Sequence, residues 1–164
     1  MVIAIPTGAK IYNYMRTVNL NATPITLNSN ASILLRICSF VVLFVLGGVT
    51  GVVRANGNLD IVLHDTMYVV AHFHFVLSLG SSIGVAVGAY YFMHLISEDY
   101  TNRVTNYNTI YYITILLISM VITFTCMHYL GWNVVPRRYL DYADYNNYWA
   151  SISTSSVIMF FITV

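Results

Sequence analysis

The feature that most constrains this chain is an apolar stretch at residues 67–96, which reads MYVVAHFHFVLSLGSSIGVAVGAYYFMHLI. It exceeds the roughly 20 residues that an α-helix needs to cross the hydrocarbon core of a bilayer. His72 and His74 lie inside it, and ionisable side chains at membrane depth are costly to keep and usually functional. The stretch therefore predicts a membrane-spanning helix that carries two functional histidines.

The spacing of the two histidines predicts two binding sites rather than one. On an α-helix, residues i and i+2 point about 200° apart, whereas two helical histidines that share one metal ion stand at i and i+4. Phe73 and Phe75 flank the pair and offer apolar walls for a flat cofactor. A neutral imidazole is a common axial ligand of haem iron, so two haems on opposite sides of one helix fit the pattern. The alternative is a pair of core histidines that are hydrogen-bonded to neighbouring helices.

The composition predicts an all-α membrane protein with several spans. Of the 164 residues, 58% are hydrophobic and 8% are charged, against about 25% charged residues in a soluble domain. The formal net charge is +1 and no basic run alternates with aromatic residues, which gives no reason to expect nucleic-acid binding. The two cysteines, Cys38 and Cys126, imply no disulfide framework.

Hydropathy predicts five spans in a single transmembrane unit that covers residues 1–164. The spans lie at roughly residues 1–18, 32–53, 67–96, 109–130 and 148–164, and polar connectors separate them. Successive connectors must alternate between the two membrane faces. The connectors at 54–66 and 131–147 therefore share one face, which we call side P, and the other two connectors share the opposite face, side N.

Side P brings polar residues of two connectors to the same membrane face. His64 and Asp65 directly precede the long helix, where Asp65 followed by Thr66 suits a helix N-cap. A carboxylate beside an imidazole also suits a divalent cation whose other ligands come from outside. Arg137 and Arg138 suit interfacial arginines that extend toward water, or a guanidinium pair that clamps carboxylates.

A lysine lies in the first span, where Lys10 ends the segment IAIPTGAK. A lysine deep in the membrane has to be paired, hydrated or deprotonated. Thr7 stands one turn earlier on the same helix face and offers a hydroxyl that passes a hydrogen bond onward. The alternative is a lysine near the helix end that extends toward side N.

Four blocks of the chain resemble subunit I of the haem–copper oxidases, in particular that of mitochondrial cytochrome c oxidase. The tenth helix of that family is similar to HDTMYVVAHFHFVLSLG, and its eighth-helix proton-pathway motif is similar to IAIPTGAK. The ninth helix with its exit loop resembles GGVTGVVRANGNLDIVLHD, and the loop between helices eleven and twelve resembles LGWNVVPRRYLDY. The blocks agree with the family in order and spacing and cover nearly the whole chain.

The resemblance implies haem and metal ligands. His72 matches the axial ligand of the high-spin haem, where oxygen is reduced, and His74 matches one axial ligand of the low-spin haem that feeds it electrons. His64 and Asp65 match ligands of Mg²⁺ near the exit for product water. The implied cofactors are two haem A groups, copper and Mg²⁺.

The resemblance also implies roles for charged residues. Asp60, Arg137 and Arg138 match residues around the haem propionates. Lys10 and Thr7 match the lysine-type proton channel that leads from side N to the binuclear centre. In that family side P is the intermembrane space and side N the matrix. The implied function is that of a multi-pass protein of the mitochondrial inner membrane, which reduces oxygen to water and translocates protons.

The same resemblance implies that another chain completes the catalytic site. The copper ligands, the second ligand of the low-spin haem and the acidic proton channel of the family have no counterpart here, and residue 1 matches a point inside the eighth helix. We therefore expect part of a twelve-helix bundle, inactive alone, whose earlier helices come from a separate polypeptide. Further expected partners are oxidase subunits II and III, cytochrome c as electron donor, and membrane lipid. Three features depart from the family. Arg54 replaces a commonly aliphatic residue, Met67 replaces a usual tyrosine, and the segment FTCMHYLG lacks the Pro-Gln that usually precedes its histidine.

Two other classes of function stay open at this point. A di-haem b-type cytochrome needs a second ligand for each haem, and His94 and His128 are poorly placed to supply it. A transporter or channel subunit without a cofactor accounts for Lys10 and the arginines as a charged pathway. That interpretation leaves His72 and His74 without a role.

Overall fold

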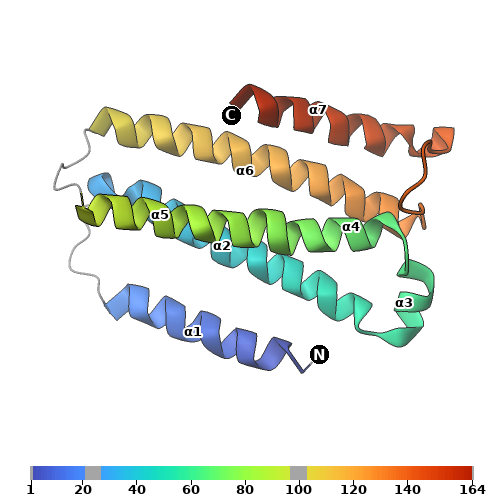
Figure 1. The fold of residues 1–164 in the computed structure, drawn as a ribbon, viewed down its shortest axis with the longest axis horizontal. Helices are drawn as coiled ribbons and strands as arrows, with labels where there is room; N and C mark the ends of the chain where they lie inside the picture. Colours follow the sequence, from blue (N-terminus) through green and yellow to red (C-terminus); the bar gives the residue numbers. More distant parts are fainter. Residues whose placement is uncertain (1, 21–26, 97–102, 164) are drawn as a thin grey trace.

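The chain folds into a bundle of long helices that run alongside one another. The computed structural model describes residues 2–20, 27–96 and 103–163, and every regular element in these ranges is helical. The long helices are α1 (Ala4–Leu20), α2 (Leu27–Arg54), α4 (Met67–Phe73) with its continuations η1 (His74–Ser81) and α5 (Ser82–Ile96), α6 (Arg103–Trp132) and α7 (Asn147–Thr163). Figure 1 shows them side by side and joined at alternating ends. The predicted all-α fold is confirmed.

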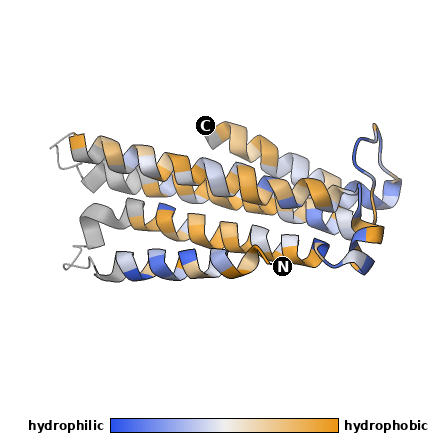
Figure 2. Cartoon of the chain, turned by 60° about the horizontal axis from the view of Figure 1, so that its bottom comes forward, coloured by the Kyte–Doolittle hydropathy of each residue, from blue (hydrophilic) through white to orange (hydrophobic). Residues whose placement is uncertain are grey.

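Three helices are long and apolar enough to cross a membrane. Within the described ranges these are Leu34–Arg54, Met67–Tyr90 and Ile110–Trp132, and each overlaps one of the predicted spans. α1 and α7 have 17 residues each, fewer than the roughly 20 of a full span, so spans at these two positions remain a prediction. Figure 2 shows apolar residues along α2, α4–α5 and α6, with polar residues at the end that holds α3.

The connector between α2 and α4 is itself partly helical. α3 (Gly57–Leu63) starts where the Asn56 side chain accepts a hydrogen bond from Asn58 N at 3.3 Å. It ends at Leu63, which is buried. The sequence predicts only a polar connector here, because a helix of 7 residues is too short for hydrophobic periodicity to reveal.

Thr66 fixes the start of the long helix. Its hydroxyl donates to the Leu63 carbonyl at 2.7 Å and accepts a hydrogen bond from Tyr68 N at 3.3 Å. An N-cap of this kind satisfies a backbone N–H that has no partner inside the helix. The sequence predicts the N-cap at Asp65 followed by Thr66, and the structure places it on Thr66 and not on Asp65.

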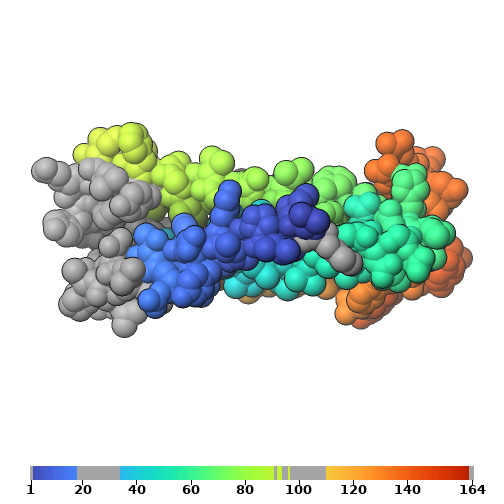
Figure 3. Space-filling model, turned by 90° about the horizontal axis from the view of Figure 1, so that it is seen from below, coloured from blue at the N-terminus to red at the C-terminus, as the bar shows by residue number. Residues whose placement is uncertain are grey.

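The buried core lies where α2, η1 and α6 meet. Leu43, Phe75, Leu79 and Phe124 form it, with the rings of Phe75 and Phe124 6.2 Å apart. α6 also packs along α4 and α7, whereas α1 meets the bundle through α2. Figure 3 shows α1 lying lengthwise on the surface of the bundle. The packing of α1 against α2 is therefore sparse.

The long central helix changes its winding at His74. From His74 to Ser81 the backbone is a π-helix, and it returns to α-helix where Ser82 N–H bonds to the Leu77 carbonyl five residues earlier. Such segments are rare and occur mostly at functional sites. The predicted continuous helix at residues 67–96 is confirmed, but the sequence pattern gives no sign of this wider turn.

The packing of α4 on α6 predicts a strong effect of one added methyl group. In G131A the new Cβ would overlap the backbone nitrogen of Tyr68, so α4 and α6 must separate at a cost of about 1–3 kcal/mol. We expect a lower Tm for the complex that contains this chain. The matched control is G88A, because a Cβ at Gly88 meets nothing within 4 Å. Equal Tm values for the two variants would contradict this packing.

Candidate functional site

The imidazole of His72 is held by α2 in one orientation. Its Nδ1 lies 3.0 Å from the Gly47 carbonyl and 3.0 Å from the Thr50 hydroxyl, and that hydroxyl donates to the same carbonyl at 2.7 Å. A carbonyl oxygen only accepts, so Nδ1 carries the hydrogen. The Nε2 atom therefore keeps its lone pair, which is the state that binds iron or another metal.

A cavity of about 640 Å³ lies beside His72, between α1, α2 and the junction of α4 with η1. This volume is in the range of pockets that hold a cofactor or a drug-sized ligand. Its walls are mostly apolar, and Thr7 of α1 and His72 are among the residues that line it. Gly51 also lines it, and a Cβ there would stand 2.8 Å from His72 Cε1. The absence of a side chain at Gly51 is thus what leaves room for the imidazole.

His74 faces a different neighbour. Its Nδ1 lies 2.7 Å from the Val70 carbonyl of its own helix, so this ring also carries its hydrogen on Nδ1. The ring is stacked on Phe73 at 4.4 Å and on Phe124 of α6 at 4.9 Å between centroids. His72 therefore points to α2 and His74 to α6, as their spacing predicted. Their roles as iron ligands stay a prediction.

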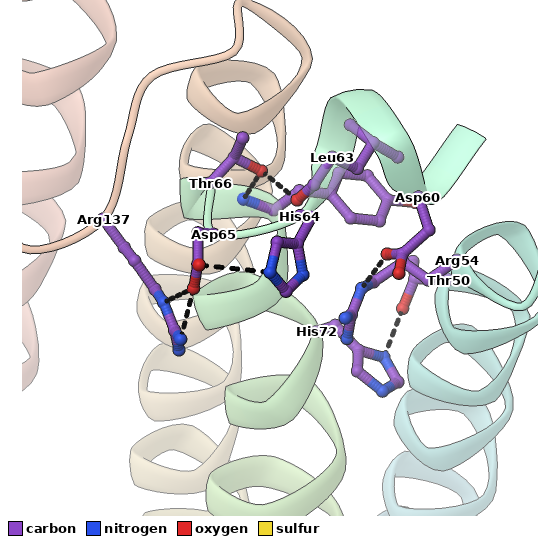
Figure 4. A network of polar contacts seen from close by, with 10 residues as sticks. Thr50, Arg54, Asp60, Leu63, His64, Asp65, Thr66, His72 and Arg137 are labelled. Atoms are coloured by element: carbon purple, nitrogen blue, oxygen red, sulfur yellow. Dashed lines mark hydrogen bonds and ion pairs between the residues drawn. The ribbon is translucent and has the colours of Figure 1, made fainter. Parts of the chain in front are cut away.

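The two side-P connectors meet at Asp65. The Arg137 side chain donates to Asp65 Oδ1 from Nε at 2.7 Å and pairs with it through a second guanidinium nitrogen. Arg137 N–H donates to the Asp65 carbonyl at 3.0 Å, and Met67 N–H donates to the Val135 carbonyl at 2.9 Å. The shared face deduced from alternating connectors is confirmed by this contact, and Figure 4 shows Arg137 and Asp65 from the two connectors in contact.

The conformation and charge of Asp65 depend on this contact. Its φ of 54° lies in the left-handed region, which few residues other than glycine adopt. The hydrogen bond from Arg137 lowers the pKa of Asp65 below its ordinary value, and the charges of Arg137, His64 and Arg138 act in the same direction. Asp65 is therefore an anion at neutral pH.

Asp65 also reaches the other predicted metal ligand. His64 Nε2 lies 3.2 Å from Asp65 Oδ2, and both side chains are exposed. Among the described residues no group of three His, Cys, Asp or Glu side chains converges on a metal position. The pair can offer a cation two donor atoms, and the remaining ligands have to be water or groups of another chain.

Asp60 pairs with Arg54 at the end of α2. Asp60 Oδ1 lies 3.5 Å from Arg54 Nε, and both atoms are buried without a hydrogen-bond partner in the described part of the chain. Arg54 is near enough to His72 and Tyr68 to interact with both electrostatically. Figure 4 shows Asp60, Arg54, Thr50 and His72 close together. Arg54 thus places a positive charge near His72.

The remaining predicted site residues are not all brought together. Thr7 lines the cavity of His72, and its hydroxyl donates to the Ile3 carbonyl at 2.9 Å. Lys10 is exposed on α1 and is not among the residues that line the cavity. Arg138 is exposed and has a φ of 69°. The structure thus places Arg137, and not the arginine pair, on the carboxylate of Asp65.

Sequence reasoning missed the residues that support His72 from α2. Gly47, Thr50 and Gly51 hold or accommodate the ring, and the signal for them was a pair of glycines four residues apart on one helix face. The His128 ring, near the end of α6, packs on Tyr68 at 5.0 Å and on Phe75 at 5.2 Å between centroids.

These features define a multi-pass membrane protein with a helix that presents two imidazoles to separate sites. The chain belongs to the cytochrome c and quinol oxidase polypeptide I family, whose model matches residues 1–164. It is 42% identical over 154 residues to cytochrome c oxidase subunit 1 of Plasmodium chabaudi. The matched segment covers 93% of this chain and 31% of that protein.

Two further relatives give a similar picture. Cytochrome c oxidase subunit 1 of Theileria annulata is 37% identical over 99% of this chain and 32% of its own length. The subunit of the same name from Eremothecium gossypii is 36% identical over 97% of this chain and 28% of its own length. The chain thus spans about a third of the length of the curated relatives it matches.

The contact between Asp65 and Arg137 predicts a pH-dependent junction of the two connectors. The pKa of Asp65 is lowered in the folded state. The stabilisation of the junction by the Asp65 carboxylate is therefore complete above about pH 4 and is lost as the pH falls through the lowered pKa. A nitroxide on Y139C, in a C38S background within the complete complex, should become more mobile below that pH.

The variants of this experiment separate the junction from general acid effects. D65N should show the mobile spectrum already at neutral pH, whereas D144N, which changes an exposed carboxylate of the same connector, should behave like the parent. Mobility in D65N that matches the parent at every pH would contradict the proposed junction.

Proposed function

We propose that this chain contributes the haem-ligating helix of a cytochrome c oxidase, which reduces oxygen to water and translocates protons. The observation that carries the proposal is the geometry of His72. Its Nδ1–H is occupied by the Gly47 carbonyl, and the ring lines a cavity of about 640 Å³ with mostly apolar walls. An imidazole with a free Nε2 beside such a cavity is what an axial haem ligand requires.

The two histidines would serve two different haem A groups. His72 would ligate the high-spin haem, and His74 would ligate the low-spin haem from the other side of the helix. In both rings the Nδ1 hydrogen bond to a backbone carbonyl fixes the tautomer and the ring plane and makes Nε2 more basic. Bound haem supplies the electron-transfer and oxygen chemistry, while this chain orients the ligands and keeps the walls apolar.

The charged residues of side P would hold the anionic edges of these groups. Asp60, Arg137 and Arg138 would surround the haem propionates, for which a guanidinium is a suitable partner. His64 and Asp65 would ligate Mg²⁺ through Nε2 and Oδ2, which already converge to 3.2 Å. The other Mg²⁺ ligands would come from water or from another subunit.

Proton delivery would enter from side N through α1. Lys10 and Thr7 would form part of a lysine-type channel, with Thr7 on the wall of the cavity that His72 lines. The exposed position of Lys10 in this chain leaves its surface open to contact with further helices of the subunit. Its side chain would there be covered by the missing part of the channel.

The proposed assembly includes several partners. The N-terminal part of subunit I, as a separate polypeptide, would supply the copper ligands and the second ligand of the low-spin haem, and this chain would be inactive alone. Oxidase subunits II and III would join it in the mitochondrial inner membrane, with cytochrome c as electron donor. The chain spans about a third of its relatives, which supports a function within a larger subunit.

A spectrum and a peptide map of the purified complex test the proposal. A-type haem bands in the reduced-minus-oxidised spectrum would support it. Bands of b-type haem would favour a di-haem b-type cytochrome, and the absence of haem bands would favour a transporter or channel subunit. Mass spectrometry of the same sample identifies the partners. One continuous peptide map through a full-length subunit I would overturn the separate polypeptide while leaving the haem ligands in place.

Replacement of each histidine should separate the two haems. H72N should remove carbon monoxide binding, because the ligand of the high-spin haem is lost, while the low-spin band persists. H74N should mainly disturb the low-spin band. Both spectra are recorded on complexes whose subunits still co-purify, so that failed assembly is recognised. Equal loss of both signals in both assembled variants would refute the assignment of the residues.

The glycine beside His72 offers a finer test. In G51A the added Cβ would lie 2.8 Å from His72 Cε1, which forces the imidazole away from its Gly47 and Thr50 partners. We expect carbon monoxide affinity to fall by about tenfold, which corresponds to an overpacking cost of about 1.4 kcal/mol. G48A is the control, since Gly48 lines the same cavity but a Cβ there meets nothing within 4 Å. Identical affinities in the two variants would contradict the role of Gly51.

A further inference from the structure

A second cavity lies at the opposite end of the bundle from Asp65, toward side N. It has a volume of about 230 Å³ and lies between α2, α5 and α6. Most of the side chains that line it are aliphatic, such as Ile83, Ala86 and Leu117, and the polar ones are Arg36, Ser39 and Tyr112. All the residues that line it belong to the apolar stretches of the three spanning helices. Arg36 stands two residues after Leu34, where the first of these stretches begins.

Arg36 is the cation of this cavity, and it has no anionic partner within the described ranges. Its guanidinium lies 4.3 Å from the centre of the Tyr90 ring, a cation–π contact that holds its position. Its Nε is buried and has no hydrogen-bond partner among the described residues. The nearby Ser39 hydroxyl donates its hydrogen bond to the Leu35 carbonyl at 2.6 Å. A buried guanidinium N–H without an acceptor is costly, and an anion beside Arg36 would supply that acceptor.

We propose that this cavity binds one anionic phospholipid from the side-N leaflet. The phosphate would accept hydrogen bonds from Arg36, and an acyl chain would follow the aliphatic walls of α5 and α6. A basic pocket between membrane helices is a recognised form of lipid head-group site. Tyr112, which is 56% exposed, also lines the cavity, and amphipathic rings of this kind are enriched at the level of the head groups. The proposal requires only that the chain spans a membrane, and it goes beyond the proposed oxidase function.

A phospholipid accounts for the cavity better than a free anion does. Apart from Arg36, Ser39 and Tyr112, the walls are aliphatic and offer a free phosphate no hydrogen bonds, whereas they suit a hydrocarbon chain. The single cation also matches the single charge of a phosphodiester. A charge near the membrane surface contributes about 1 kcal/mol to the binding of an anionic lipid, which corresponds to about fivefold in affinity.

The test uses the complete complex that contains this chain, in detergent. It is incubated with phosphatidylglycerol that carries a diazirine in its acyl chain, or with phosphatidylcholine of the same chains, then irradiated, digested and mapped by mass spectrometry. We expect phosphatidylglycerol to label the segments 83–86 and 113–117 and phosphatidylcholine to label them about fivefold less. Equal labelling by the two lipids, or labelling elsewhere in the complex with none in these segments, would overturn the proposal.

Matched variants test the role of the arginine. R36M should lower the labelling about fivefold, R36K should retain most of it, and R16Q, which removes an exposed arginine from α1, should change nothing. A86F fills the cavity without touching the charge and should also lower the labelling. Unchanged labelling in R36M and A86F would refute the site.

A competition arm separates the two sources of phosphate. Excess inorganic phosphate should leave the labelling of 83–86 and 113–117 unchanged, and complete competition would identify a free-anion site and overturn the lipid. The haem spectrum of each sample is recorded in parallel. The haem assignment can therefore fail while the lipid labelling is still observed, and the lipid labelling can fail while the haem assignment still holds.

Discussion

The hydrogen bond from His72 Nδ1 to the Gly47 carbonyl is the contact on which the proposed chemistry of this chain depends. In a membrane interior an imidazole N–H without an acceptor is costly, and α-helical carbonyls are normally committed within their own helix. Thr50 and His72 nevertheless share the Gly47 carbonyl, and Gly51 leaves the space for the ring. The shared carbonyl thereby ties the two helices together and leaves the lone pair on Nε2 of a ring that lines the cavity.

The side-P junction works on a different principle. It lies outside the apolar windows of the spanning helices, with Asp65 exposed and Arg137 half-buried, and ion pairs at a protein surface contribute little to stability. What distinguishes it is that backbone hydrogen bonds accompany the pair of Asp65 and Arg137. The connectors before α4 and after α6 are therefore joined as a small two-stranded contact, with an isolated bridge between Thr66 and Pro136. A cofactor edge that lies beneath would meet a positioned guanidinium.

Sequence reasoning reached the fold and the membrane faces but not the supporting contacts. Long apolar runs predict helices, and alternating connectors place Asp65 and Arg137 on one face without further assumption. The π-helical turn at His74 could not be predicted, because the same apolar residues suit either winding. Thr50 was missed because a threonine in an apolar helix usually bonds its own backbone, and only tertiary packing reveals that it reaches His72. The pairing of Arg54 with Asp60 likewise needed α3, whose turn brings them together.

The π-helical segment takes up one residue more than α-helical winding would hold over the same length, because each of its turns closes on the fifth residue instead of the fourth. Removal of one residue from His74–Ser81 together with a return to α-helical winding would therefore leave the two ends of the central helix in nearly the same rotational phase. Tyr90 would stay near Arg36 and His72 against Gly47. The extra residue thus changes the backbone locally beside His74 and leaves the register between the imidazole and the distant aromatic ring intact.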